Sequence, residues 1–247
     1  MNIYVLNKSS VLTDAQVQHW LPAFSVFVGH VRAWWPRPAS LVWCPRDHEP
    51  ELGWKLIFAD KSDEAGALGY HDFTPDGRPI SYVFAADDLA SGYNPTVTAT
   101  HEIAEMIADP WISECFQISN TQFFAKEVCD PCEADEFAYS IKVGPFSAVQ
   151  VSDFVLPKWF IPASTGQFDH NHKIDRPLKL LPGGYMSVFT SGRGWTQVTA
   201  QKGGEIVVAG ADSTKTAYGR LAKYGRIREA TLDWSLVEAS GELVPSA

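Results

Sequence analysis

A histidine and two glutamates, His101, Glu102 and Glu105, lie within five residues of one another in the chain. His101 and Glu105 are four residues apart, so on an α-helix their side chains leave the same face, one turn apart. An imidazole and a carboxylate placed in this way can bind one metal ion. Glu102 would lie about 100° round the helix axis, near a water molecule at that ion but not among its ligands. The spacing therefore predicts a metal site with an adjacent general base.

The pattern His-Glu-x-x-Glu is a weak signal alone, because helices are rich in glutamate and a solvated polar face is the ordinary explanation. Two features of the surrounding sequence favour metal binding. Most other residues from Val97 to Ala108 are small or apolar, which predicts a buried helix, and buried carboxylates need partners. A second acidic cluster, from Glu127 to Asp135, could supply a third ligand. The pattern is also that of the His-Glu-x-x-His zinc helix with its second His replaced by Glu.

The helix that carries these residues has clear end signals. Asn94 is a good N-cap, and Pro95 suits the first helical position, where a missing N–H costs nothing. Pro110 should end the helix.

The segments before this helix alternate between strand and helix patterns. An amphipathic helix is expected from Thr13 to about Val31, either kinked at Pro22 or split there into two. A strong turn signal, Thr74-Pro-Asp-Gly77, joins the last two strands. We predict an α+β fold in which a mixed sheet is backed by one helix and packed against the metal helix. The expected strands are Asn2–Leu6, Ser40–Cys44, Trp54–Ala59, Gly66–His71 and Ile80–Ala85.

The pattern changes after Asp135. We expect residues 1–135 to form the metal-binding core, residues 136–182 an irregular segment that lines the cleft, and residues 183–247 a small β-rich addition. The expected strands of this addition are Tyr185–Thr190, Trp195–Ala200 and Glu205–Ala209. The C-terminal tail is locally basic, which predicts either a solvated surface or a docking strip for an acidic partner. Its basic residues are Lys215, Arg220, Lys223, Arg226 and Arg228.

Composition and charge limit the classes of function. The net charge of −9 argues against a general nucleic-acid or anionic-membrane binder. No apolar run reaches the ~20 residues of a membrane span. The N-terminus lacks the basic start and apolar stretch of a signal peptide, so we expect a cytoplasmic protein, with association with a virion as a second location.

The four cysteines are too few for a disulfide framework in a chain of this length. Cys129 and Cys132 form a C-x-x-C pair. A local turn with two thiols is the favoured interpretation; half of a structural zinc site with His170 and His172, or a redox pair, are the alternatives.

Several motifs together resemble a family of uncharacterised bacterial and phage-encoded metallopeptidases of the zincin type. The resemblance rests on His101-Glu-Ile-Ala-Glu-Met-Ile-Ala-Asp-Pro110 and on Glu127-Val-Cys-Asp-Pro-Cys-Glu133, and it runs to about residue 200. The segments 63–72, 151–154 and 181–185 also look like that family. A fainter similarity, limited to the two acidic motifs, links the chain to the plant Exordium-like proteins.

The resemblance implies a zincin-like fold and a role for each motif residue. His101 and Glu105 would be zinc ligands, Glu102 the general base, and Glu127 or Asp130 the third ligand, with the other nearby. The strand Ile80–Ala85 would be the sheet edge that pairs with a peptide substrate. A carboxylate-rich site would also accept Mn²⁺ or Ca²⁺ more readily than a histidine-rich one.

A peptidase also needs a group that stabilises the oxyanion. Tyr70 and His71 are the first candidates, and Tyr139 and His170 are weaker ones. We expect a zinc-dependent peptidase that acts on a peptide or protein. The competing hypothesis is a phage-related structural or accessory protein in which the metal site is structural or vestigial.

Overall fold

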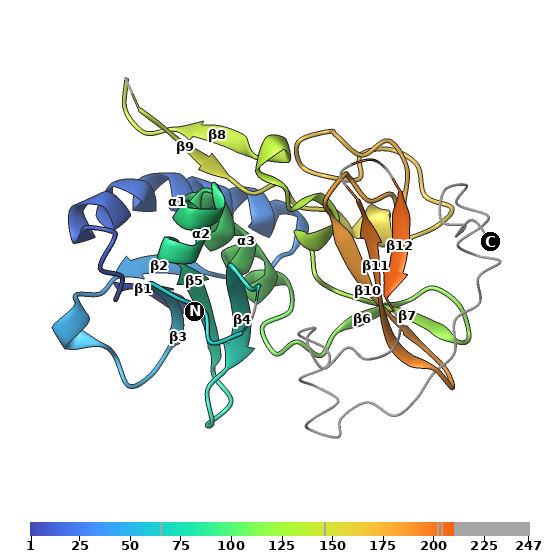
Figure 1. Cartoon of the computed structure of the whole chain (residues 1–247), viewed down its shortest axis with the longest axis horizontal. Helices are drawn as coiled ribbons and strands as arrows, with labels where there is room; N and C mark the ends of the chain where they lie inside the picture. Colours follow the sequence, from blue (N-terminus) through green and yellow to red (C-terminus); the bar gives the residue numbers. More distant parts are fainter. Residues whose placement is uncertain (65, 146, 202, 204, 210–247) are drawn as a thin grey trace. The chain divides into compact units, whose positions relative to one another are not determined.

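The computed structural model describes residues 1–209, apart from residues 65, 146, 202 and 204 (Figure 1). Its contacts divide the chain into two compact units, and neither unit is continuous in sequence. The first unit comprises Met1–Trp111 and Ala138–Ser152, and the second comprises Ile112–Phe137 and the chain from Asp153 onward. The predicted 136–182 segment is therefore divided between the two units. The basic residues of the tail lie outside the described residues.

The first unit is built on a five-stranded mixed sheet with the strand order β2-β1-β3-β5-β4. Strands β2, β1, β3 and β5 are parallel, and β4 is antiparallel to β5 at the edge. This confirms the predicted α+β class and four of the five predicted strands to within a residue at each end, whereas the predicted strand Gly66–His71 begins three residues later, at Gly69. The strands are β1 (Asn2–Asn7), β2 (Ser40–Trp43), β3 (Trp54–Ala59), β4 (Gly69–Phe73) and β5 (Pro79–Phe84).

The predicted sheet edge was wrong. Strand β5, which covers most of Ile80–Ala85, lies between β3 and β4, so its backbone groups are paired on both sides. The tight turn from Thr74 to Gly77 folds β4 back along β5 and places β4 at the edge. The sequence pattern of a strand does not show whether that strand lies inside the sheet or at its edge.

Helix α1 (Asp14–Trp34) begins with the predicted capping box, in which Thr13 and Gln16 satisfy each other's backbone N–H groups. It is one continuous helix with the exposed Pro22 inside it, so of the two predicted alternatives, a kink or two short helices, the second was wrong. Trp20 of α1 packs against Phe58 of β3, with ring centroids 5.8 Å apart. This contact places α1 on one face of the sheet.

Helix α3 (Pro95–Ala108) is the predicted metal helix and follows the short helix α2 (Ala85–Ser91), which was not predicted. The Asn94 side chain accepts a hydrogen bond from the Thr96 backbone N–H, as expected for its N-cap, and Pro95 occupies the first turn. The helix ends at Ala108, just before Asp109 and Pro110. It packs against β4, β5 and α1, and most of its side chains are buried.

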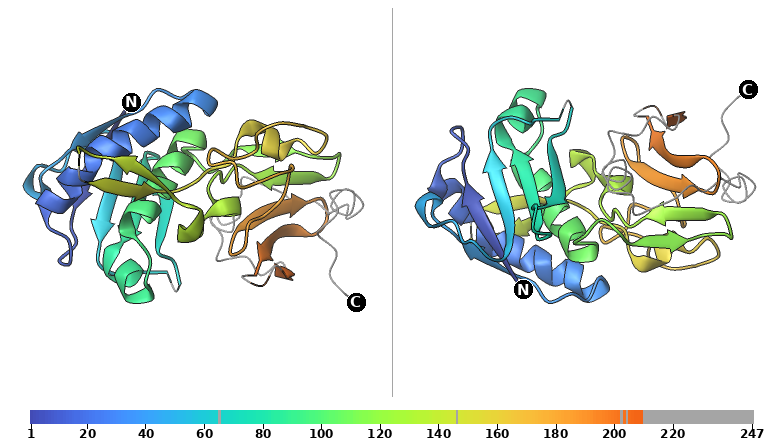
Figure 2. Two further views of the ribbon diagram at one scale, coloured as in Figure 1. Left: turned by 90° about the horizontal axis from the view of Figure 1, so that it is seen from above. Right: turned by 90° about the horizontal axis from the view of Figure 1, so that it is seen from below.

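A hairpin from later in the sequence completes the first unit. Strands β8 (Tyr139–Lys142) and β9 (Ala148–Val151) pack against α1, and β9 also packs against α3 (Figure 2). Two hydrogen bonds fix this contact: Thr96 Oγ1 donates to the Gln150 carbonyl at 2.7 Å, and the Ser152 N–H donates to Thr100 Oγ1 at 2.8 Å. Because the hairpin lies against α3, the position of α3 depends on residues far from it in sequence.

The second unit contains an antiparallel sheet with the order β12-β11-β10-β7-β6. The three predicted C-terminal strands are confirmed as β10 (Tyr185–Thr190), β11 (Gly194–Ala200) and β12 (Ile206–Ala209). They pair with β6 (Cys115–Gln117) and β7 (Gln122–Ala125) through β10 and β7, so they are part of a larger sheet. Short 3₁₀ turns lie at Arg46–His48 in the first unit, and at Asp130–Cys132, Asp135–Phe137 and Pro157–Phe160 in the second.

Two fully buried carboxyl groups, Asp153 and Asp169, are hydrogen-bonded to each other in the second unit. Burial and the Asp169 carboxyl raise the pKa of Asp153 to about 9, so Asp153 holds a proton at neutral pH. Backbone N–H groups saturate the other oxygens: Asp153 Oδ1 accepts from Phe154 and Asn171, and Asp169 accepts from Lys173 and Ile174. The pair thus joins two loop segments through one shared proton.

Among the described residues, no helix has both the length and the apolar character that a membrane crossing requires.

Candidate metal centre

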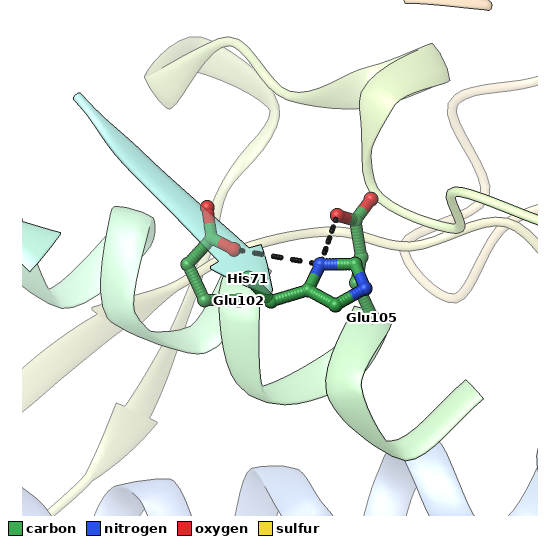
Figure 3. A group of neighbouring side chains, drawn as sticks. All are labelled: His71, Glu102 and Glu105. Atoms are coloured by element: carbon green, nitrogen blue, oxygen red, sulfur yellow. Dashed lines mark ion pairs between the residues drawn. The ribbon is translucent and has the colours of Figure 1, made fainter. Parts of the chain in front are cut away.

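One face of α3 meets the edge strand β4 in a buried cluster of His71, Glu102 and Glu105 (Figure 3). One ligand atom from each of these residues lies within 4.8 Å of the others. His71 Nδ1 lies 3.6 Å from Glu105 Oε2 and 3.8 Å from Glu102 Oε2. All three residues are at most 4% exposed, which is rare for ionisable groups without a counter-charge.

Strand geometry explains why His71 reaches this cluster and Tyr70 does not. Successive strand residues point to opposite faces, so Gly69 and His71 face α3 and Tyr70 faces away. The Tyr70 ring contacts Tyr82, and its hydroxyl donates to Asp63 at 2.9 Å. Of the two residues predicted to stabilise the oxyanion, the structure brings only His71 to the glutamates.

His101 extends the cluster along the helix. Its Nε2 lies 3.3 Å from Glu105 Oε2, as the spacing of four residues predicts. The same Glu105 oxygen therefore lies near both His101 Nε2 and His71 Nδ1. In the part of the chain that the structure describes, His101 is not a member of the group of His71, Glu102 and Glu105.

The distances between these groups fit the ligands of one ion better than direct ion pairs. Charge-assisted N–H···O hydrogen bonds are about 2.7–2.9 Å long. Two ligands of a tetrahedral zinc ion are about 3.4 Å apart, given bonds of roughly 2.0–2.2 Å. The His101–Glu105 separation of 3.3 Å is close to that value, whereas the surface pair Lys55–Glu49 is 2.7 Å apart. The residues present therefore fit a divalent cation.

The electrostatics of the cluster also favour a bound cation. Burial opposes ionisation of Glu105, but the charge of His101 and hydrogen bonds from His101 and His71 outweigh it and lower the Glu105 pKa. Burial likewise opposes a charge on His71, yet Glu105, Glu102 and Asp109 raise its pKa. The cluster thus draws positive charge toward Glu105, whether as protons or as a metal ion.

The other predicted residues lie elsewhere. Glu127 and Asp130 belong to the second unit, where both are buried, and their role as further ligands stays a prediction. Tyr139 pairs with His30 Nδ1 at 2.9 Å, and the His170 ring stacks on Phe154. Neither contact resembles a site for an oxyanion.

The structure also bears on the three interpretations of the C-x-x-C pair. Cys129 and Cys132 are both buried, and the described residues contain no disulfide bond. Burial and nearby acidic groups, Asp153 among them, raise the pKa of Cys132 well above its usual value. A raised pKa disfavours the thiolate that redox chemistry or zinc binding needs.

Two contributors to the cluster were missed from the sequence. The Asp109 carbonyl lies 3.3 Å from His71 Nε2, and Gly69 leaves the space that the Glu102 carboxylate occupies. A Cβ at Gly69 would lie 2.8 Å from Glu102 Oε1 and 2.9 Å from the Tyr82 carbonyl. The sequence did contain one indication of this arrangement: Gly69 and His71 are two residues apart on a strand, so they must share a face.

Comparison with protein-family models, with curated proteins and with solved structures found no match.

Proposed function

We propose that this chain is a metal-dependent hydrolase of zincin-like design that cleaves a peptide or amide bond, with zinc as its metal. The observation that supports this most directly is the helix face of α3. It holds His101 Nε2 and Glu105 Oε2 at 3.3 Å, the separation of two ligands of one ion, with Glu102 as the next residue after His101.

Each residue has a distinct task in this proposal. His101 and Glu105 hold the ion. A bound Zn²⁺ would lower the pKa of water and polarise the scissile carbonyl. Glu102 takes a proton from the attacking water and returns it to the leaving amine. Glu102 is 4% exposed, so little bulk water competes for that proton.

The edge strand is the proposed substrate-binding element. An extended peptide can add to an exposed sheet edge through backbone hydrogen bonds. Strand β4 is such an edge, and its His71 side chain faces α3. We therefore assign this role to β4 in place of Ile80–Ala85. A cell-wall amide or an ester would use the same proton transfers.

Elemental mass spectrometry of purified wild-type protein and His101→Ala tests the metal site. About one zinc per chain in the wild type, lost in the variant, is expected for a site with His101 as ligand. Absence of any divalent metal after dialysis against zinc would contradict the proposal.

The Glu102→Gln variant tests the chemistry. It should keep its metal but lose hydrolysis of a peptide library, by at least about 100-fold, because an amide cannot accept the proton. His30→Ala is a suitable control, since His30 contacts Tyr139 and lies outside the cluster. Full hydrolysis by Glu102→Gln would contradict the role of Glu102 as base.

A second candidate function is a structural metal site in a phage-related accessory protein. The burial of both Glu102 and Glu105, each 4% exposed, favours it, because structural ions are enclosed by protein ligands. In that case Glu102 itself would bind the ion. Glu102→Gln would then lower the metal content, which separates this candidate from the hydrolase.

A further inference from the structure

Strand β4 contacts the catalytic helix through two residues of one face, Gly69 and His71. The contact with His71 is unusual because one imidazole reaches both glutamates of α3. Its Nδ1 lies 3.6 Å from Glu105 and 3.8 Å from Glu102, and the side chain is 2% exposed (Figure 3). A side chain so deeply buried is held by packing and cannot turn toward a substrate.

The other ring nitrogen fixes the orientation of His71. Nε2 lies 3.3 Å from the carbonyl oxygen of Asp109, the residue that ends α3. A carbonyl can only accept a hydrogen bond, so Nε2 is the donor and Nδ1 faces the carboxylates. The ring is thereby fixed between the end of α3 and the two glutamates one to two turns earlier.

Gly69 completes this arrangement from the same strand. A Cβ at this position would lie 2.7 Å from Thr98 Cγ2 and 2.8 Å from Glu102 Oε1. Strand β4 can approach α3 closely only because residue 69 has no side chain. The Glu102 carboxylate is thus confined between the Gly69 backbone and the His71 ring.

We propose that His71 is a positioning residue of the metal site, which orients the ligand Glu105 and the base Glu102 together and does not itself bind the ion. This inference rests on the proposed function. Outer partners of metal-binding carboxylates commonly change metal affinity by about 10- to 100-fold. His71 has the position of such a partner, since it comes from strand β4 and its Nδ1 lies within 3.8 Å of both Glu105 and Glu102.

Titration of the metal-free full-length protein with Zn²⁺ and with Co²⁺ tests the proposal. His71→Ala should still bind about one ion per chain, with an affinity about 10- to 100-fold weaker than that of the wild type. The Co²⁺ absorption bands should keep their positions, because the ligands are the same. His71→Asn, which keeps a smaller polar side chain beside the two carboxylates, should recover part of the affinity.

Two controls make the comparison specific. His30→Ala removes another partly buried histidine of the first unit and should bind both ions as the wild type does. His101→Ala removes a proposed ligand and should not bind. If far-UV circular dichroism shows that His71→Ala is unfolded, His71→Asn and His71→Gln serve in its place.

The outcomes separate the two proposals. Wild-type affinity in His71→Ala would overturn the positioning role and leave the metal site intact. Loss of all binding in folded His71→Ala, or shifted Co²⁺ bands, would make His71 a ligand and also overturn the proposal. Absence of binding by the wild type would overturn the proposed function itself.

Discussion

At the scale of single residues, Glu105 has the most demanding position, with imidazole nitrogens of His71 and His101 at 3.6 and 3.3 Å from one carboxylate oxygen. Its pairing with His101 could be predicted, because helix periodicity alone brings residues four apart together. Its contact with His71 could not be derived in the same way. That contact depends on the register of β4 against β5 and on how closely β4 approaches α3, and neither is a local property of the sequence.

The buried pair of Asp153 and Asp169 makes stability depend on pH. The Asp153 pKa is raised from 3.8 to about 9, so between these values the folded protein keeps a proton that the unfolded chain releases. Its contribution to stability is complete below pH 3.8 and is lost as pH rises toward about 9. Asp153→Asn cannot ionise at this position. As pH rises, the free energy of unfolding of the wild type should therefore fall relative to that of the variant.

Urea denaturation at about pH 5.5, 7 and 8.5 measures the difference in free energy of unfolding between the wild type and Asp153→Asn. Asp175→Asn is the matched control, because Asp175 is exposed and pairs with Lys179 at the surface. Parallel pH profiles for the wild type and Asp153→Asn would contradict the assignment of the raised pKa to Asp153.

Thr100 gives a second prediction at the residue scale. Its buried hydroxyl donates within α3 and accepts the Ser152 N–H at 2.8 Å. Thr100→Val keeps the shape but leaves that N–H unsatisfied, which should lower the free energy of unfolding by about 1–3 kcal/mol. Chemical denaturation measures the loss. Thr199→Val, on a half-buried strand position, is the control and should change it by less than about 0.5 kcal/mol.

At the scale of elements, end signals were the most informative part of the sequence. Asn94, Pro95 and the Asp109-Pro110 pair defined α3 to within a residue, because caps act through neighbouring backbone groups. Strand order was not accessible in this way. The edge position of β4 results from which strands pair, and pairing partners can be far apart in sequence.

The N-cap of α3 should contribute measurably to stability. Asn94 Oδ1 accepts a hydrogen bond from the Thr96 N–H at 3.1 Å. Asn94→Ala should lower the free energy of unfolding by about 1 kcal/mol. Asn94→Asp keeps an acceptor at the helix N-terminus and should restore most of it. An equal loss in both variants would show that the side chain acts through its contact with Gln150 instead.

Helix α1 contains a residue that weakens it. Pro22 is exposed and lies in the helix interior, where it removes one backbone hydrogen bond. Pro22→Ala should therefore raise the free energy of unfolding, by about 1–3 kcal/mol. Thermal unfolding checks this, with Ala15→Gly in the first turn as a variant of opposite expected sign. A lower melting temperature for Pro22→Ala would mean that the ring makes packing contacts of its own.

At the scale of the whole molecule, the sequence pattern changes after Asp135, but the two units do not divide the chain there. The chain passes between them after Trp111, after Phe137 and after Ser152. Composition reports which segments are apolar or irregular. It does not report that the β8–β9 hairpin packs back on a helix formed some forty residues earlier.

This connectivity determines the order in which contacts can form while the chain is being synthesised. A ribosome releases α3 with its two glutamates well before it releases the hairpin that supplies the Gln150 and Ser152 contacts. Until residue 152 has emerged, α3 lacks the contacts of Thr96 and Thr100 with the hairpin. The unit that carries the proposed ion site is therefore complete only after more than half of the chain has been made.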